Sequence, residues 1–196
     1  MTKTEQLAVI YQTKCRDCRR CALAQYRHNL VFGDGNPDRQ IMLIGEGPGE
    51  QEDLTGIPFV GKAGQLLDQM LDIINLTRED YYICNIVKCR PPQNRDPQTV
   101  EQDACIHWLN QQIRVVEPKI VVCLGRIAAC RIIRDNYRIT REHGRWEQRN
   151  GVWLTAIYHP SALLRDVSKR PETFDDLKSI QQKIWEVFPE RQSEPW

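Results

Sequence analysis

Four short apolar runs recur along the chain, and longer segments with a different periodicity separate them. The runs are rich in Ile and Val, and three of them are apolar enough for strands buried on both faces. The predicted strands are 40–45, 81–87, 119–125 and 152–160. The separating segments space their apolar residues as helices do. The predicted helices are 61–76, 99–116, 125–135 and 173–188. This alternation predicts an α/β fold with three layers, α/β/α, around a mainly parallel central sheet of about four strands.

Unusual polar segments follow each predicted strand. They read "GEGPGEQED", "KCRPPQNRDP", "GR" and "HPSALLR" in chain order. The carboxyl ends of parallel strands share one edge of a sheet, and ligands bind outside that edge. The sequence therefore predicts a single site, rich in glycine, proline and charged residues, along one rim of the sheet.

The bulk composition limits the class of protein. The chain has 196 residues, of which 41% are hydrophobic and 27% charged, which suits one domain over 1–196. No run approaches the roughly 18 consecutive apolar residues of a membrane span, and the N-terminus lacks the pattern of an export signal. We therefore expect no membrane association and a cytoplasmic location. In that reducing compartment, the eight cysteines are expected to ligate metal or to be buried, not to form disulfides.

The cysteines suggest a metal site of undecided type. "CRDCRRC" at 15–21 holds three cysteines in two overlapping C-x2-C pairs. Cys89 closes the second predicted strand, and Cys105 lies in the first turns of the next helix, so both can face the N-terminal segment. One pair with these two residues gives four thiolates, which suit an iron–sulfur cluster or zinc. The alternative is that Cys89 and Cys105 are small buried residues.

The net charge of +1 conceals a concentration of arginines in one third of the chain. The simplest interpretation of such a run is a solvated helix face. These residues are Arg126, Arg131, Arg134, Arg138, Arg141, Arg145 and Arg149.

Three long motifs stand in one order downstream of the C-x2-C pairs: "GEGPGEQEDLTGIPFVGKAGQLLD", "NIVKCRPPQNRDP" and "HPSALLR". This arrangement resembles the family 4 uracil-DNA glycosylases, the iron–sulfur branch of the uracil-DNA glycosylase superfamily, from about Cys18 to Arg165. The resemblance implies a uracil-DNA glycosylase-like fold. It also implies a monofunctional enzyme that flips uracil out of DNA, hydrolyses its N-glycosidic bond and leaves an abasic site in base excision repair. We expect a monomer with uracil-containing DNA as its partner.

The resemblance also selects the cysteines. It implies a [4Fe-4S] cluster on four of them, with an N-terminal arm that carries the first two. Cys21 precedes Leu23 and stands at the family's distance from "VFGDGNP", which leaves Cys15 as the spare cysteine. Glycosidic hydrolysis is redox-neutral, so we expect the cluster to brace the arm and the "PPQNRDP" loop. The implied ligands are Cys18, Cys21, Cys89 and Cys105.

A uracil in duplex DNA must be rotated into a pocket before its bond can be cut. The resemblance gives Phe59 the role of stacking on uracil. Asn85 carries an amide whose donor suits uracil O4 and whose acceptor suits N3–H, the reverse of the cytosine pattern. His159 is the expected donor to uracil O2, as a neutral imidazole. Backbone amides around Gly47 and Gly49 can approach the base because no side chain intervenes.

The group that positions the attacking water is left open. In the best-known uracil-DNA glycosylases an aspartate stands in this loop, whereas here the position is Gly47. Either Glu46 or Glu52 is expected to orient water and stabilise the cationic sugar, and Glu52 is alternatively expected to exclude the methyl group of thymine. Glu50 and Asp53 are interpreted as solvated loop carboxylates.

DNA is expected to be held by its phosphates. Arg126, Ser161 and Arg165 are candidates on the predicted rim. Leu163 or Leu164 is expected to fill the gap left by the flipped base, as apolar wedges do in DNA-bending proteins.

Three other functions remain as alternatives. The first is a non-catalytic DNA-binding or polymerase-associated iron–sulfur module, which the arginines and cysteines would also suit. The second is the covalently trapping relative of the same superfamily, but 85–100 lacks the basic, histidine-bearing insertion of that type. The third is a phosphate-binding enzyme, which ranks last because no "GK[ST]" follows the first strand.

Overall fold

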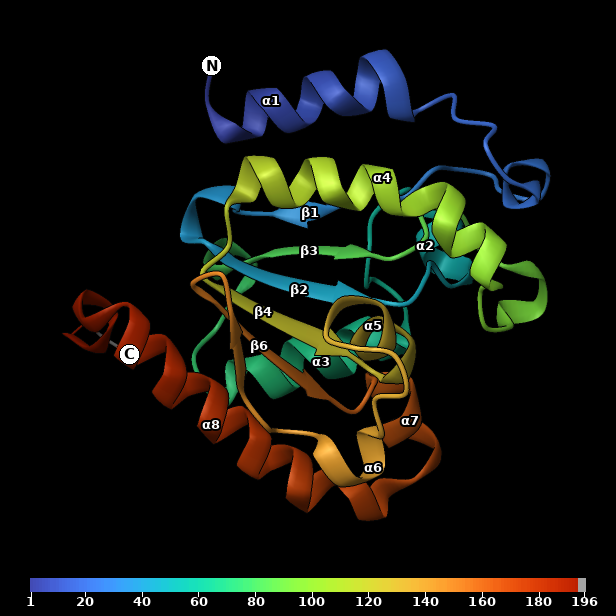
Figure 1. Cartoon of the computed structure of the whole chain (residues 1–196). Helices are drawn as coiled ribbons and strands as arrows, with labels where there is room; N and C mark the ends of the chain where they lie inside the picture. Colours follow the sequence, from blue (N-terminus) through green and yellow to red (C-terminus); the bar gives the residue numbers. More distant parts are fainter. Residues whose placement is uncertain (194–196) are drawn as a thin grey trace.

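The computed structural model describes residues 1–193 and contains one six-stranded sheet in the order β1-β3-β2-β4-β6-β5 (Figure 1). Its four inner strands run parallel, and the two edge strands are antiparallel to their neighbours. The strands are β1 (Asp34–Gly35), β2 (Ile41–Gly45), β3 (Tyr82–Asn85), β4 (Ile120–Leu124), β5 (Glu147–Arg149) and β6 (Val152–Ile157). The α/β prediction with a mainly parallel sheet is confirmed.

The inner strands are the four that the apolar runs predicted. Every residue of β2, β3 and β4 is buried, as expected for strands covered on both faces. The two edge strands add to the expected four. They contain two and three residues, "DG" and "EQR", and so carry no apolar run that sequence reasoning can detect.

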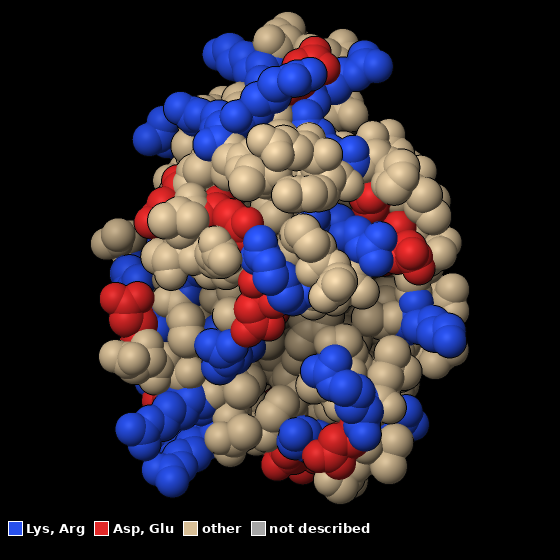
Figure 2. All heavy atoms as spheres, turned by 90° about the vertical axis from the view of Figure 1, so that its right-hand side faces the viewer, with Lys and Arg blue, Asp and Glu red and all other residues tan. Residues whose placement is uncertain are grey.

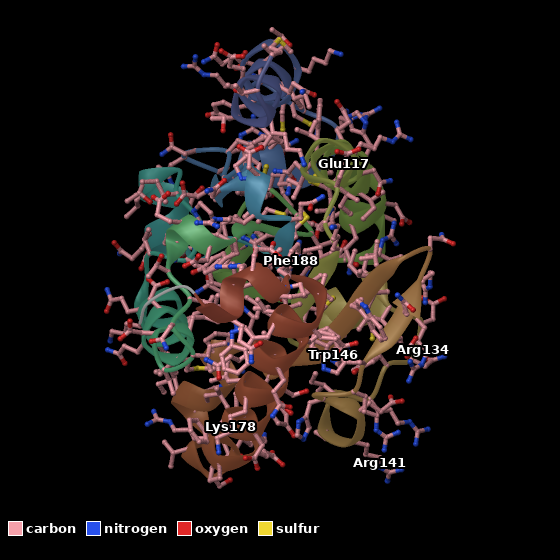
Figure 3. The ribbon with its side chains drawn as sticks, turned by 90° about the vertical axis from the view of Figure 1, so that its left-hand side faces the viewer. Glu117, Arg134, Arg141, Trp146, Lys178 and Phe188 are labelled. Carbon is pink, nitrogen blue, oxygen red and sulfur yellow. The ribbon has the colours of Figure 1, made fainter. Side chains whose placement is uncertain are left out.

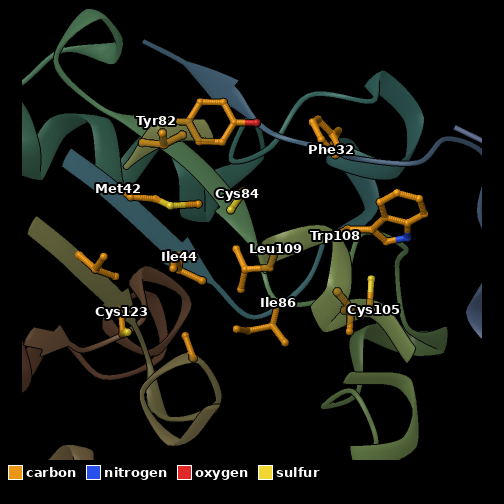
Figure 4. Close-up of a cluster of buried hydrophobic side chains, with 14 of the residues drawn as sticks. Phe32, Met42, Ile44, Tyr82, Cys84, Ile86, Cys105, Trp108, Leu109 and Cys123 are labelled. Atoms are coloured by element: carbon orange, nitrogen blue, oxygen red, sulfur yellow. The ribbon is translucent and has the colours of Figure 1, made fainter. Parts of the chain in front are cut away.

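One face of the sheet packs against α1 (Lys3–Ile10), α4 (Thr99–Val116) and α5 (Arg126–Ile132). Met42 and Ile44 of β2 point into this layer, where they meet apolar side chains such as Leu109 of α4 (Figure 4). Leu43, the residue between them, points the other way, because side chains alternate along a strand.

The opposite face packs against α3 (Lys62–Asp72), α7 (Pro160–Arg165) and α8 (Arg170–Val187). Ile41 and Leu43 lie in this second core with side chains from all three helices. The two cores on either side of the sheet confirm the three-layer arrangement.

Several short elements escaped the sequence patterns. The short α-helices are α2 (Glu50–Thr55) and α6 (Ile139–Glu142), and the 3₁₀ turns are Ala22–Gln25, Pro37–Arg39, Arg78–Asp80, Pro92–Asn94, Val167–Lys169 and Pro189–Ser193; a π-helical turn spans Tyr11–Cys15. Helix α1 was also missed, although Thr2 and Glu5 form a capping box at its start. Helix α7 was missed too. Helix α1 buries only Leu7, and α2 and α6 bury no apolar side chain, so these helices show no clear periodicity, whereas α5, of similar length, was predicted.

The parallel strands all point to the right in Figure 1, toward α2, α7 and the loop after β3. This is the rim on which the sequence placed the site. Within residues 1–193, no helix combines the length and the apolar composition that a membrane crossing requires.

The predicted arginine run does not form one helix face. Its members lie in α5, α6, β5 and the segments that connect them, and Arg134 pairs with Glu142 and Glu147. Figure 3 shows Arg134 and Arg141 projecting outward at the periphery of the molecule. The arginines are thus largely solvated, as expected, but they are spread over several elements and the segments between them.

Gly64 of α3 offers a test of how tightly the rim is packed. A Cβ at this position would lie 1.9 Å from the Phe59 carbonyl oxygen, which is backbone and cannot move away as a flexible side chain can. We expect Gly64→Ala to lower the free energy of unfolding by about 1–3 kcal/mol, measured by chemical denaturation. Gln69→Ala, at an exposed position of the same helix, should change it by less than about 0.5 kcal/mol. Equal stabilities of the two variants would contradict this packing.

Candidate active site

A cavity of about 660 Å³ opens at the carboxyl ends of the parallel strands. Figure 2 looks onto this side of the molecule, where basic and acidic side chains surround a hollowed, uncharged centre. Nine residues that the sequence assigned to catalysis, uracil binding and phosphate contacts line the cavity: Glu46, Gly47, Glu52, Phe59, Asn85, Arg126, His159, Ser161 and Arg165.

Asn85 ends β3 with its side chain buried at 2% exposure. Its Oδ1 atom is inaccessible to solvent and has no hydrogen-bond partner. A Cβ at Gly45 would lie 2.4 Å from both this oxygen and Cζ of Phe59, so glycine at the end of β2 makes room for both groups. A buried acceptor without a partner costs about 1–3 kcal/mol. Such an atom is therefore suited to a bound ligand that donates a hydrogen bond.

Phe59 adopts a left-handed backbone conformation, φ 56°. Non-glycine residues in this region are strained and persist only when their surroundings hold them. Here Arg78 donates a 2.7 Å hydrogen bond to the Phe59 carbonyl, and Gly64 packs directly against it. The ring lies 6.1 Å from that of His159, at an interplanar angle of 35°. The left-handed conformation thus places the aromatic ring of Phe59 beside that of His159.

His159 caps the start of α7, and its Nδ1 accepts the backbone N–H of Ser161 at 3.1 Å. A neutral ring in this position carries its proton on Nε2, which leaves an N–H donor on the other side of the ring. Burial, with a smaller contribution from Arg165, lowers the pKa of His159 to about 4 against the opposing effect of Glu52. The imidazole is therefore neutral at physiological pH.

The two candidate glutamates differ in what holds them. Oε1 of Glu52 accepts the backbone N–H groups of Val60 (2.9 Å) and Gly61 (2.7 Å), so this carboxylate fixes the loop that carries Phe59. Burial, with a smaller contribution from Asp96, raises the pKa of Glu46 to about 7 against the opposing effects of Arg126 and Arg165. These contacts favour Glu46 as the carboxylate that acts in the cavity.

The interpretation of Asp53 as a solvated carboxylate is wrong. Asp53 is 1% exposed. Its carboxylate accepts the backbone N–H of His28 at 2.9 Å and lies 2.6 Å from His28 Nδ1. The pair ties α2 to the segment before β1. Glu50 is exposed, as expected, and its Oε1 lies 3.6 Å from Arg90 Nη1.

The predicted DNA-binding residues are not equivalent. Arg126 donates to Asp96 at 2.8 Å, and the Ser161 hydroxyl lies 2.8 Å from His159 Nδ1, where it orients the ring. Arg165 is exposed at the end of α7. Leu163 is 1% exposed and belongs to the core, whereas Leu164 is 44% exposed. Only Leu164 is therefore placed to enter DNA.

The four predicted cysteine ligands, Cys18, Cys21, Cys89 and Cys105, line one small cavity between the N-terminal arm, the loop after β3 and α4. N–H groups donate to three of the sulfur atoms: Trp108 Nε1 to Cys18 (3.4 Å), Arg27 Nη1 to Cys89 (3.2 Å) and the Lys88 amide to Cys105 (3.3 Å). Within residues 1–193, no three His, Cys, Asp or Glu side chains form a group that could hold a metal ion. The thiols thus surround a space and do not converge on a point.

Cys15 is fully buried and is not among the residues that line the cysteine cavity, in keeping with a spare residue.

Sequence reasoning missed several residues around these two sites. Arg27 contacts both the arm and the β3 loop, Lys88 joins the β3 loop to α4, and Arg78 holds the loop of Phe59. No local pattern marks these residues, because their partners are distant in sequence. Only Lys88 leaves a signal in the sequence, because in "NIVKC" it directly follows an apolar strand and is therefore a candidate for burial.

Comparison with known proteins places this geometry in a family. The model of the uracil DNA glycosylase superfamily matches residues 32–186. A type-4 uracil-DNA glycosylase from Thermotoga maritima is 44% identical over 86% of this chain and 88% of its own length. Type-4 uracil-DNA glycosylases from Archaeoglobus fulgidus and Sulfurisphaera tokodaii are 44% and 42% identical over 83% and 84% of this chain, and over 86% and 79% of their own lengths. The chain belongs to the uracil DNA glycosylase superfamily.

Proposed function

We propose that this chain is a uracil-DNA glycosylase that receives a uracil nucleotide rotated out of DNA, hydrolyses the N-glycosidic bond and leaves an abasic site for base excision repair. One observation carries the proposal most directly: Asn85, whose buried amide oxygen has no hydrogen-bond partner, is among the residues that line a cavity formed by the family motifs. The similarity to type-4 enzymes over most of the chain supports it independently.

Recognition follows from the donor and acceptor pattern of the base. Oδ1 of Asn85 accepts uracil N3–H, and Nδ2 of the same amide donates to O4. Cytosine presents an acceptor at N3 and a donor at the 4-position, so the same amide would be left unpaired against it. Phe59 stacks on the base. Rejection of cytosine thus comes from buried polar groups that lose their partners, which is an effective discriminator.

Catalysis consists of stabilising the uracil anion as it departs. Nε2–H of His159 donates to uracil O2, where negative charge develops. The residue needs no proton from solvent, because its pKa of about 4 keeps the ring neutral. The backbone amide at Gly47 approaches the base, because no side chain intervenes. A Cβ there would already lie 2.8 Å from Val87.

Glu46 is the carboxylate that we assign to the attacking water and the cationic sugar. Its pKa of about 7 suits a group that accepts a proton near neutral pH. Glu52 is assigned to holding the loop of Phe59, because Oε1 is already used by two backbone amides. We infer no direct contact between Glu52 and the base.

DNA is held along the rim. Arg165 and Arg126 pair with phosphates, and Leu164 enters the gap left by the flipped nucleotide. Ser161 acts through His159. We further propose that the whole chain, 1–196, acts as one domain and as a monomer in the cytoplasm. Residues 194–196 of that range lie outside the described part of the chain.

We propose that the four cysteines of this cavity hold a [4Fe-4S] cluster. Four thiols around a space, with N–H donors directed at three sulfurs, form the donor set and the surroundings that such clusters use. A bound cluster would supply a cross-link between the arm at Cys18 and Cys21, the β3 loop at Cys89 and α4 at Cys105. The reaction itself needs no electron transfer.

Strand cleavage after alkali, on single strands and on U·G and U·A duplexes, tests the function. We expect the wild type to produce breaks at uracil and Asn85→Leu to cut about 100-fold more slowly, since a hydrogen bond to the base is lost. Replacing an unpaired buried amide with an apolar group of similar shape should leave the melting temperature unchanged or raise it. A lower melting temperature with normal cleavage would instead give Asn85 a structural role. Absence of breaks from wild-type protein that still binds DNA would favour the non-catalytic module, and a covalent protein–DNA band would favour the trapping relative.

The pH dependence tests Glu46. Cleavage should rise as the carboxyl ionises near pH 7, with no limb from His159 above pH 5. Stability changes in the opposite direction. The pKa of Glu46 is 4.5 in the unfolded chain and about 7 in the folded chain, so the folded state binds more protons between these values. Stability therefore falls as pH increases from 4.5 to about 7. Glu46→Gln should remove both trends, cut slowly at every pH and melt higher than wild type above pH 7. A pH profile that is the same in Glu46→Gln would rule out this assignment.

Iron analysis tests the cysteine assignment. We expect about four irons per chain in the wild type, because a [4Fe-4S] cluster contains four irons. Cys130→Ser should retain them, because Cys130 lies outside the cavity. Cys105→Ser should lose most of the iron. Cys15→Ala should retain it, since Cys15 is assigned as the spare. Loss of iron from Cys15→Ala and not from Cys105→Ser would reverse the assignment.

A further inference from the structure

Lys88 is completely buried, at 0% exposure. It lies in the loop after β3, between Asn85 and Cys89. Lysine is almost never fully buried unless its ammonium is paired, because removing the charge from water is expensive. The hydrogen-bond partners of this ammonium therefore indicate the role of the residue.

The ammonium binds two neutral oxygens. Nζ donates to the backbone carbonyl of Asn85 at 2.7 Å and to Oε1 of Gln112 at 2.5 Å. Hydrogen bonds from a charged donor are shorter and about twice as strong as neutral ones. The carbonyl of the base-reading residue is thus the acceptor of one of these strong bonds.

The second acceptor is itself fixed. Gln112 of α4 is 0% exposed, and its Nε2 donates to the Phe32 carbonyl at 2.8 Å and to the Tyr82 hydroxyl at 2.9 Å. The backbone N–H of Lys88 meanwhile donates to Cys105 Sγ. Lys88 therefore stands on a rigid base formed by α4, β3 and the cysteine cavity.

We infer that Lys88 is a positioning residue for Asn85: its buried ammonium holds the Asn85 carbonyl and so keeps the amide side chain directed at the base. This inference rests on the proposed function. Asn85 is the last residue of β3, and the N–H of the next residue, Ile86, donates to the Gly45 carbonyl at 2.9 Å on one side of the peptide group. The Asn85 carbonyl oxygen, on the other side of this peptide group, needs its own restraint. The ammonium supplies that restraint. A displacement of the amide by about 1 Å is enough to lower the rate by about 100-fold.

Lys88→Met replaces the ammonium with an apolar group of similar length and tests the inference. Four quantities are measured: the inhibition constant of free uracil, kcat on uracil-containing DNA, the dissociation constant for uracil-free DNA and the iron content per chain. We expect uracil to inhibit at least about 10-fold more weakly and kcat to fall about 10- to 100-fold. Affinity for uracil-free DNA and iron content should remain within twofold of wild type. An unchanged uracil inhibition constant overturns the inference, even if the melting temperature falls.

Lys183→Met is the matched control. This lysine of α8 packs its Nζ 3.8 Å from the centroid of the Trp153 ring and does not line the active-site cavity. The substitution should lower stability without changing the uracil inhibition constant. If it weakens uracil inhibition as much as Lys88→Met does, a general loss of stability explains both effects and the inference fails.

Gln112→Met carries the test if Lys88→Met does not accumulate as folded protein. It retains the ammonium but removes its fixed second acceptor, and we expect uracil inhibition to weaken by at least about threefold. Unchanged inhibition overturns the inference. The wild type separates the two proposals: if it neither cuts uracil-containing DNA nor is inhibited by uracil, the proposed function fails, whereas a normal wild type with unaffected variants refutes only the role of Lys88.

Discussion

The active site depends on a close approach at the end of β2, where Gly45 leaves one space for the Asn85 amide and the Phe59 ring. Any side chain there would overlap both groups. Parallel pairing with β3 brings Asn85 directly opposite Gly45, and the left-handed Phe59 completes the contact. The cost is visible in the unpaired amide oxygen and the strained backbone. Both are expected where a fold gives up stability for a prearranged binding surface.

The supports of this arrangement come from all three layers. Glu52 and Arg78 hold the Phe59 loop from α2 and from the turn before β3, and Lys88 holds the Asn85 carbonyl with the help of α4. Ser161 fixes the histidine tautomer. These three charged residues, Glu52, Arg78 and Lys88, therefore act by holding neutral groups in place. The neutral amide and imidazole are the groups that we assign to the base.

The sequence predicted the sheet and the rim well, because buried parallel strands leave continuous apolar runs and their carboxyl ends must meet. It also identified the residues of the cavity, chiefly through the resemblance of three long motifs. It did not distinguish Glu46 from Glu52 or Leu163 from Leu164. Those differences depend on hydrogen bonds and burial between segments far apart in the chain, as with Glu52 and Gly61. The pairing of Asp53 with His28 and the burial of Lys88 escaped prediction for the same reason.

Crystals soaked with uracil offer the most direct test of the central claim, that the unpaired amide of Asn85 reads the base. The account predicts uracil in the cavity with N3 at hydrogen-bonding distance from Asn85 Oδ1, about 2.7–3.2 Å, O2 facing Nε2 of His159 and the ring stacked on Phe59. Uracil bound elsewhere in the cavity, or an Asn85 side chain turned toward a protein partner and away from the base, would contradict it.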